Sequence, residues 1–198
     1  MSDLLEIQRE LQAQADQVVR MLQLNERLSA LGQPVRVGSS AMGLMVRRDI
    51  DITVICDKLD ADALDAFTAL GTCFMRMTEQ VVAVRFRNDC RQWNREPEKY
   101  PDGLYLWLSV QAPDQTMWTI DIWLVDQPGR QPDIAHLKTL MPRLTDGDRE
   151  TILRIKTVLA ESPQNGASIP SALVYEAVMD NGIDTIAGFE NWYRERAP

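Results

Sequence analysis

Apolar residues at the start of the chain recur every three or four positions, with glutamine, glutamate and arginine between them. The series runs through Leu4, Ile7, Leu11, Ala15, Val18 and Leu22. This spacing places the apolar side chains on one face of a helix. The pattern continues through Leu28 and Leu31 until Gly32 and Pro34, two residues that stop a helix. We therefore predict a helix over residues 3–31 that packs on the flank of the protein.

The middle of the chain changes to short runs in which apolar and polar residues alternate. These runs predict strands at residues 35–37, 49–56, 104–110 and 118–125, and a strand or strand pair over 74–87. A helix is predicted at residues 60–70, closed by Gly71. Between the strands, the polar stretch NDCRQWNREPEKYPDG at residues 88–103 predicts a long loop. Loops of that length are often functional or mobile.

After Gly129 the strand pattern ends, and the apolar positions follow helical spacing only. They predict helices at residues 135–141, 148–161, 171–180 and 185–194. The chain therefore reads as an α+β protein with a mixed β-sheet flanked by helices, followed by a C-terminal helical domain. We place the boundary near residue 130, with one domain over residues 1–130 and the second over residues 131–198.

Composition narrows the classes of partner. The sequence opens with no basic-then-apolar leader and contains no run of about 18 apolar residues, so neither a signal peptide nor a membrane partner is expected. Its three cysteines form no C-x-x-C pair, which predicts a cytoplasmic protein without structural zinc. With 29 acidic and 21 basic residues, the net charge of -8 disfavours a long nucleic acid as partner. A small or cationic partner is easier to accommodate.

Two carboxylates stand one residue apart in a run that otherwise reads as a buried strand. In the alternation of a strand, Asp49 and Asp51 share one face while Ile50 and Ile52 face the core. Two anions held about 7 Å apart at their α-carbons repel each other unless a cation compensates them. A divalent cation that takes oxygen ligands resolves this conflict, and Mg²⁺ is the default.

A third carboxylate interrupts a later apolar strand. Asp121 lies between Ile120 and Ile122 in the stretch TMWTIDIWLVD. A lone aspartate in a central strand is costly unless something compensates its charge. Three acids on two apolar strands can converge on a pair of metal ions, which clamps the attacking and leaving oxygens in nucleotidyl transfer. Upstream, the Gly38-Ser39 turn at a strand end could hold a polyphosphate, although such a turn alone is weak evidence.

The combination of these motifs resembles a known family. Val37-Gly38-Ser39, nine residues, Asp49-Ile50-Asp51-Ile52 and the later Asp121 are similar to the nucleotidyltransferase superfamily of DNA polymerase β type. The match is strongest to its small bacterial members, the aminoglycoside and lincosamide nucleotidyltransferases and the minimal nucleotidyltransferases. The resemblance covers residues 38–126 by motif, and the helical tail only in general character.

The resemblance implies a role for each matching residue. Gly38 and Ser39 would hold the phosphates of ATP or another nucleoside triphosphate. Asp49, Asp51 and Asp121 would bind two Mg²⁺ ions and carry catalysis, and Asp121 would also deprotonate the acceptor. The sequence departs from the family where Met42 replaces an arginine and Arg48 replaces a serine, so Arg47 or Arg48 would take over a phosphate contact. Lys156 could reach the triphosphate from the helical tail, or could be a surface lysine.

The expected function is a magnesium-dependent nucleotidyltransferase. It would transfer a nucleoside monophosphate to a hydroxyl of a small molecule and release pyrophosphate. The preferred transfer would be of AMP from ATP. A nucleotide-binding regulatory module, or an enzyme of toxin–antitoxin type that acts on a partner protein, remains an alternative. Tyr105 and Trp107 share one strand face and could either pack in the sheet or stack on an acceptor ring.

Overall fold

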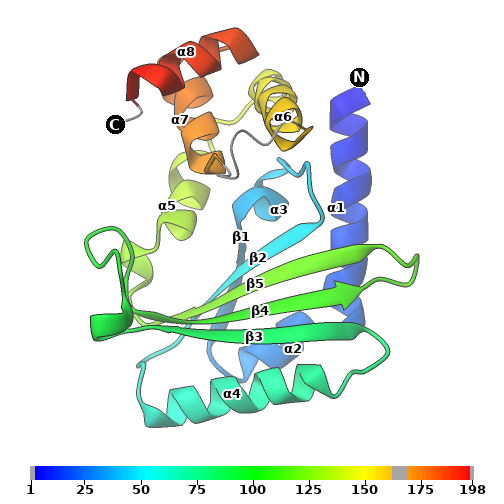
Figure 1. Ribbon diagram of the computed structural model, residues 1–198, viewed down its shortest axis with the longest axis vertical. Helices are drawn as coiled ribbons and strands as arrows, with labels where there is room; N and C mark the ends of the chain where they lie inside the picture. Colours follow the sequence, from blue (N-terminus) through cyan, green and yellow to red (C-terminus); the bar gives the residue numbers. More distant parts are fainter. Residues whose placement is uncertain (1–2, 162–168, 197–198) are drawn as a thin grey trace.

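A single mixed sheet of five strands organises the front part of the protein. The computed structural model describes residues 3–161 and 169–196. The strands are β1 (Gln33–Val37), β2 (Asp49–Ile55), β3 (Val81–Asp89), β4 (Gly103–Gln111) and β5 (Met117–Val125). Their order is β1-β2-β5-β4-β3, and β2 and β5 run parallel while the other neighbours are antiparallel (Figure 1). The mixed sheet and the α+β class predicted from the sequence are confirmed.

The two faces of this sheet have different chemistry. One face carries the aliphatic residues of the strands and packs on α1, α2 and α4, the last of which lies below the sheet in Figure 1. Ile50, Ile120 and Leu106 on this face are fully buried. The other face carries the aspartates of β2 and β5 and looks toward the C-terminal helices. The core therefore lies on one side of the sheet, which leaves the opposite face for a site.

The predicted N-terminal helix is broken in the structure. It divides into α1 (Asp3–Met21) and α2 (Leu24–Ser29), and between them Gln23 adopts a left-handed conformation with φ 51°. A single helix over residues 3–31 was the wrong prediction, because no glycine or proline marks this break. The bend lets Leu24 and Leu28 enter the same core as Val18.

Gly71 lies inside a helix instead of ending it. Helix α4 (Ala61–Met75) is capped at its N-terminus by Asp60, whose carboxylate accepts a hydrogen bond of 3.1 Å from the backbone N–H of Ala63. A Cβ atom on Gly71 would lie 2.2 Å from the Cζ atom of Phe86 on β3. The glycine therefore provides room for strand β3 against the helix.

The C-terminal part is helical, as predicted. It contains α5 (Pro132–Thr139), α6 (Asp146–Glu161), α7 (Ser171–Asn181) and α8 (Ile186–Arg196). Their apolar faces form a second core, which also takes in Met42 from the short helix α3 (Gly38–Met42) and Leu44 after it. The domain boundary near residue 130 stays a prediction. None of the described helices has the length and apolarity needed to cross a membrane.

Candidate active site

The three predicted aspartates meet on the open face of the sheet. Strands β2 and β5 run parallel in a register that pairs Asp51 with Asp121 and Asp49 with Thr119. One carboxylate oxygen from each aspartate lies within 4.8 Å of the other two. Paired residues of neighbouring strands point to the same face, so the register itself produces the cluster. Their use as metal ligands stays a prediction.

The surroundings leave one of the three carboxylates uncompensated. Asp49 accepts a hydrogen bond of 2.6 Å from the Thr119 hydroxyl, and Asp121 accepts one from the Tyr105 hydroxyl. Within the described residues, the Asp51 carboxylate accepts no hydrogen bond. Burial, together with repulsion from Asp49 and Asp121, raises the pKa of Asp51 to about 8. Burial also raises the pKa of Asp121, although the hydrogen bond from Tyr105 opposes this change.

This donor set fits a divalent cation. Several converging carboxylate oxygens, with an excess of negative charge that the protein does not neutralise, are the ligands that Mg²⁺ prefers. A bound cation would supply Lewis-acid stabilisation of phosphate oxygens at this place.

Gly38 brings the backbone directly against the aspartate cluster. It has a left-handed conformation with φ 64° at the end of β1. A Cβ atom at this position would lie 2.2 Å from the Oδ2 atom of Asp51. Only glycine therefore fits a turn that passes so close to the carboxylate. Ser39 follows at the start of α3, so both residues of the predicted phosphate turn lie beside the cluster.

Lys156 is not the surface residue that one interpretation of the sequence expected. It is only 7% exposed, and its Nζ atom donates hydrogen bonds of 2.6 Å to the Leu44 carbonyl and 3.3 Å to the Tyr175 hydroxyl. Burial lowers its pKa to about 8, while the nearby charge of Asp51 opposes this change. The lysine therefore lies within electrostatic reach of the cluster. Its contact with a nucleotide stays a prediction.

The two residues that depart from the family motif, Met42 and Arg48, lie in different environments. Met42 is buried in the second core, so its side chain offers no phosphate contact. Arg48 is exposed, and its charge helps the hydrogen bonds from Thr116 to lower the pKa of Asp114 at the β4–β5 turn. Arg47 is the arginine whose charge acts on Lys156. A phosphate contact of Arg47 or Arg48 therefore stays a prediction.

Two arginines that stack on aromatic rings beside the aspartate cluster were not identified from the sequence. The Arg85 guanidinium lies 4.8 Å from the centre of the Trp107 ring. The Arg87 guanidinium lies 4.7 Å from the centre of the Tyr105 ring. In β3 and β4 these residues share the face of Asp121, because Trp107 pairs with both Arg85 and Asp121. The alternation of residues 82–87 indicated that Arg85 and Arg87 share one face of a strand. It could not show which strands neighbour that strand in the sheet.

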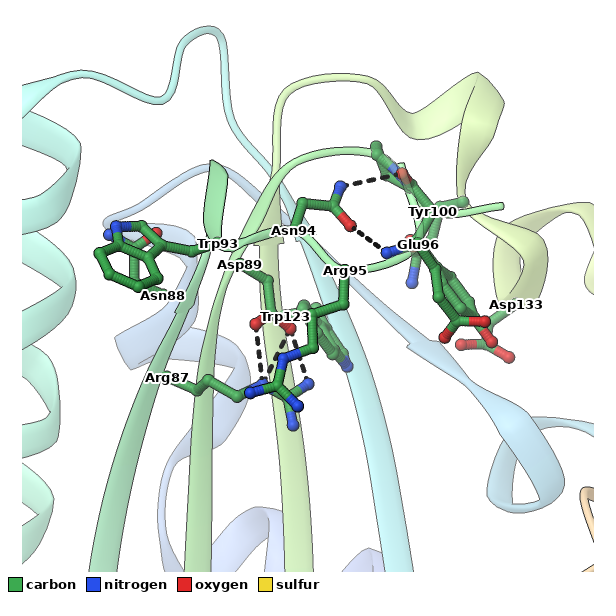
Figure 2. A pocket seen from close by; sticks show the side chains of 12 residues that line it. Arg87, Asn88, Asp89, Trp93, Asn94, Arg95, Glu96, Tyr100, Trp123 and Asp133 are labelled. Carbon is green, nitrogen blue, oxygen red and sulfur yellow. Dashed lines mark hydrogen bonds and ion pairs between the residues drawn. The ribbon is translucent and has the colours of Figure 1, made fainter. Parts of the chain in front are cut away.

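The polar loop predicted at residues 88–103 borders a cavity of about 670 Å³. The loop contributes Arg95, Glu96 and Tyr100, the sheet contributes Arg87 and Trp123, and the start of α5 contributes Asp133, all shown in Figure 2. Trp123 lies two residues after Asp121 on the same face of β5. The cavity therefore opens beside the aspartate cluster.

Comparison with known proteins gives structural matches only. No family model and no curated protein matches the chain. Cid1, described as having RNA terminal uridylyl transferase activity, aligns over 92% of this chain and 48% of its own, with 19% identity and a TM-score of 0.57. A mutant of Cid1 poly(U) polymerase bound to MgATP aligns over 92% and 52%, with 17% identity and a TM-score of 0.55. This chain spans about half the length of the solved structures it matches.

The chain has the nucleotidyltransferase fold. The resemblance of polymerase β type inferred from the motifs is thereby confirmed at the level of the fold.

The exclusion of long nucleic acids as partners was wrong. Cid1, which has this fold, is described as acting on RNA. The physical reason is that net charge is a sum over the whole chain, whereas binding depends on the local distribution of charge. In this protein the acids of the cluster count toward the total, while the exposed Arg85 and Arg87 lie on the same face of the sheet.

Proposed function

We propose that this protein is a metal-dependent nucleotidyltransferase that transfers a nucleoside monophosphate from a nucleoside triphosphate to a hydroxyl group. The observation that carries the proposal is the cluster of Asp49, Asp51 and Asp121, with ligand oxygens within 4.8 Å of one another, on a nucleotidyltransferase fold. The three carboxylates are half-buried, and within residues 3–161 and 169–196 none of them forms an ion pair, an arrangement that is costly for a protein with no need of a bound cation.

The residues around the cluster have distinct roles in this proposal. Gly38 and Ser39 hold the β- and γ-phosphates by close backbone approach. Asp49 and Asp51 hold the cations, and Asp121 both completes their ligands and accepts the proton of the attacking hydroxyl. The acceptor oxygen forms a bond to the α-phosphorus. The bond between the α-phosphorus and the oxygen that bridges it to the β-phosphorus breaks, and pyrophosphate leaves with the electron pair of that bond. Two Mg²⁺ ions and ATP are the proposed cofactor and donor.

Two classes of acceptor have support. A small molecule fits the cavity of about 670 Å³, because binding sites for small molecules have volumes of about 300–1,000 Å³. An RNA end is the acceptor suggested by the description of Cid1. Both present a hydroxyl to the same three aspartates, so the transfer chemistry is common to them.

The test is transfer from each of the four nucleoside triphosphates labelled at the α-phosphate. We expect label in an acceptor, with an equal amount of pyrophosphate, only when Mg²⁺ is present. The matched control is Asp114→Asn, which removes one carboxylate at the β4–β5 turn, away from the cluster, whereas Asp51→Asn removes one within it. Equal pyrophosphate release by the parent and Asp51→Asn would contradict the proposal.

A further inference from the structure

We propose that the cavity bordered by residues 88–103 is the acceptor site, and that it takes a nucleotide unit with a free ribose hydroxyl. The cavity is the one lined by Arg87, Arg95, Glu96, Tyr100, Trp123 and Asp133. This inference rests on the proposed function, because an acceptor site has meaning only for a transferase. It goes further by assigning the acceptor a place and a chemical class.

The position of the cavity follows from the order of the strands. The phosphate turn at Gly38 lies on the β1 side of Asp51, and Asp121 lies on the neighbouring strand β5. Nucleotidyl transfer proceeds in line, so the attacking hydroxyl and the leaving pyrophosphate stand on opposite sides of the α-phosphorus. The acceptor therefore lies on the far side of Asp121, over β5, β4 and β3. The described cavity with Trp123 and Arg87 in its wall lies on that side.

Direct contacts join the cavity to the cluster. Arg87 stacks on both Tyr105 and Trp123, with its guanidinium 5.3 Å from the centre of the Trp123 ring. Tyr105 in turn donates its hydroxyl hydrogen bond to Asp121. A molecule in the cavity is therefore next to the residues that perform the transfer.

One end of the cavity is suited to a phosphate group. Figure 2 shows Arg87 and Arg95 reaching toward the same end. Arg87 is held by Asp89, whose carboxylate accepts hydrogen bonds of 2.8 and 3.0 Å from the Nε atom. Within residues 3–161 and 169–196, Arg95 makes neither a hydrogen bond nor an ion pair. A guanidinium without a partner, beside one already fixed in place, offers a charge-assisted contact to a phosphate.

The rest of the cavity is suited to a ring and to hydrogen-bond donors. The indole of Trp123 provides a flat wall; its ring centre lies 4.9 Å from that of Tyr105, and the Arg87 guanidinium packs against both rings. Bases stack on aromatic rings and on guanidinium planes. Glu96 and Asp133 line the opposite side, where their carboxylates can accept hydrogen bonds from amino or ribose hydroxyl groups (Figure 2).

An acceptor whose only charges are amines fits this cavity less well. Two arginines occupy one end, and Glu96 is already within 3.6 Å of the Lys99 ammonium. A polyamine would meet like charge at Arg87 and Arg95 and would gain only the carboxylate of Asp133, which forms no ion pair within the described residues. A phosphate, a ring and several donors together describe a nucleotide, either free or at the 3′ end of a single strand.

The first test measures binding without catalysis. With a chelator present, UMP, AMP and a short single-stranded RNA are titrated into the protein, and quenching of tryptophan fluorescence is followed. We expect saturable binding that Arg95→Ala weakens at least about tenfold, because a charge-assisted contact to phosphate is lost. The control Arg91→Ala makes the same charge change in the same loop outside the cavity and should bind like the parent.

The second test measures transfer with the same ligands as acceptors, with amine-bearing polyols for comparison. We expect Arg95→Ala to raise the KM for the acceptor while the KM for the triphosphate stays unchanged. A preference for UMP or AMP identifies a free nucleotide as the source, and a preference for RNA identifies a strand end. Transfer to polyols alone, or an unchanged acceptor KM in Arg95→Ala, overturns the inference.

The two tests separate this inference from the proposed function. Chelator-resistant nucleotide binding that depends on Arg95, without pyrophosphate release under any condition, contradicts the proposed function but supports a nucleotide site in the cavity. Magnesium-dependent pyrophosphate release without binding of any nucleotide to the cavity leaves the proposed function standing and overturns the acceptor site.

Discussion

The hydroxyl of Tyr105 donates a hydrogen bond to the Oδ1 atom of Asp121, from the strand next to it in the sheet. Tyr105 is only 9% exposed, and its ring packs against both the Trp123 ring and the Arg87 guanidinium. A side chain held this firmly can fix the orientation of the carboxylate that it contacts. Asp121 therefore has one oxygen committed to Tyr105 and one available to a cation or an acceptor.

Tyr105→Phe should lower kcat by about tenfold to a hundredfold, because outer-shell partners of ligand residues usually have effects of this size. The KM for the triphosphate should change little, since the phosphate turn is untouched. Steady-state kinetics at varied triphosphate concentration measures both quantities. Tyr193→Phe removes the same hydroxyl from helix α8 and should leave both at the parent values. An unchanged kcat in Tyr105→Phe would show that the hydrogen bond has no positioning role.

Asp121→Asn should separate stability from catalysis. Replacing one anion of a crowded acidic cluster by a neutral amide relieves repulsion, so the metal-free protein should melt at the same or a higher temperature. Transfer should fall by orders of magnitude, because the site loses a ligand and the proton acceptor. Thermal melting and the α-labelled transfer assay give the two results. Transfer at near-parent rates would remove Asp121 from the site.

Asp51 should make the stability of the metal-free protein depend on pH. Its pKa is raised in the folded state from 3.8 to about 8, so the folded protein holds this proton more tightly than the unfolded chain does. The contribution of Asp51 to stability is therefore fully favourable below about pH 4 and is lost as pH rises toward about 8. Urea unfolding with chelator present measures the stabilities of the parent and of Asp51→Asn. At low pH the two should differ only by a constant amount that reflects the replacement of the carboxyl group by an amide. As the pH rises, Asp51→Asn should become increasingly more stable than the parent. A constant difference between pH 4 and 8 would contradict the raised pKa.

Magnesium should be needed for stabilisation by ATP. If Asp49 and Asp51 hold a cation that bridges to the phosphates, Mg-ATP should raise the melting temperature, and ATP with excess chelator should not. Differential scanning fluorimetry with matched ATP concentrations measures the shift. Equal shifts in the two conditions would argue for a nucleotide pocket that does not depend on the aspartates.

Gly38→Ala should damage the site far more than a matched glycine change. Gly38 and Gly182 have similar left-handed conformations, with φ of 64° and 66°. The backbone strain of alanine is therefore comparable at the two positions, about 1–2 kcal/mol. Only at Gly38 does the added Cβ meet a side chain, 2.2 Å from Asp51 Oδ2, whereas nothing lies within 4 Å at Gly182. Gly38→Ala should lose Mg-ATP binding and transfer, while Gly182→Ala should keep both. Equal activity in the two variants would place the phosphate turn elsewhere.

The sequence predicted the parts of the structure that local pattern controls. Alternation identified the strands of Asp51 and Asp121, and the costly acids on them indicated one shared site. The pattern did not determine the strand order, so the stacking of Arg87 on Tyr105 could not be foreseen. Nor could the burial of Lys156, because a lysine in the second half of an amphipathic helix is usually solvated. The bend at Gln23 depends on packing in the core, and no residue near it in the sequence indicates a break in the helix.

The second core joins the two halves of the chain across the predicted boundary near residue 130. Met42 and Leu44 follow the phosphate turn directly, yet their side chains are buried among the C-terminal helices. The front part, if expressed alone, would carry an exposed apolar patch at the very segment that must present phosphate-binding amides. The part of this protein that has the nucleotidyltransferase fold therefore depends on the helical tail, and truncations that remove the tail should lose the proposed phosphate site before they lose the sheet.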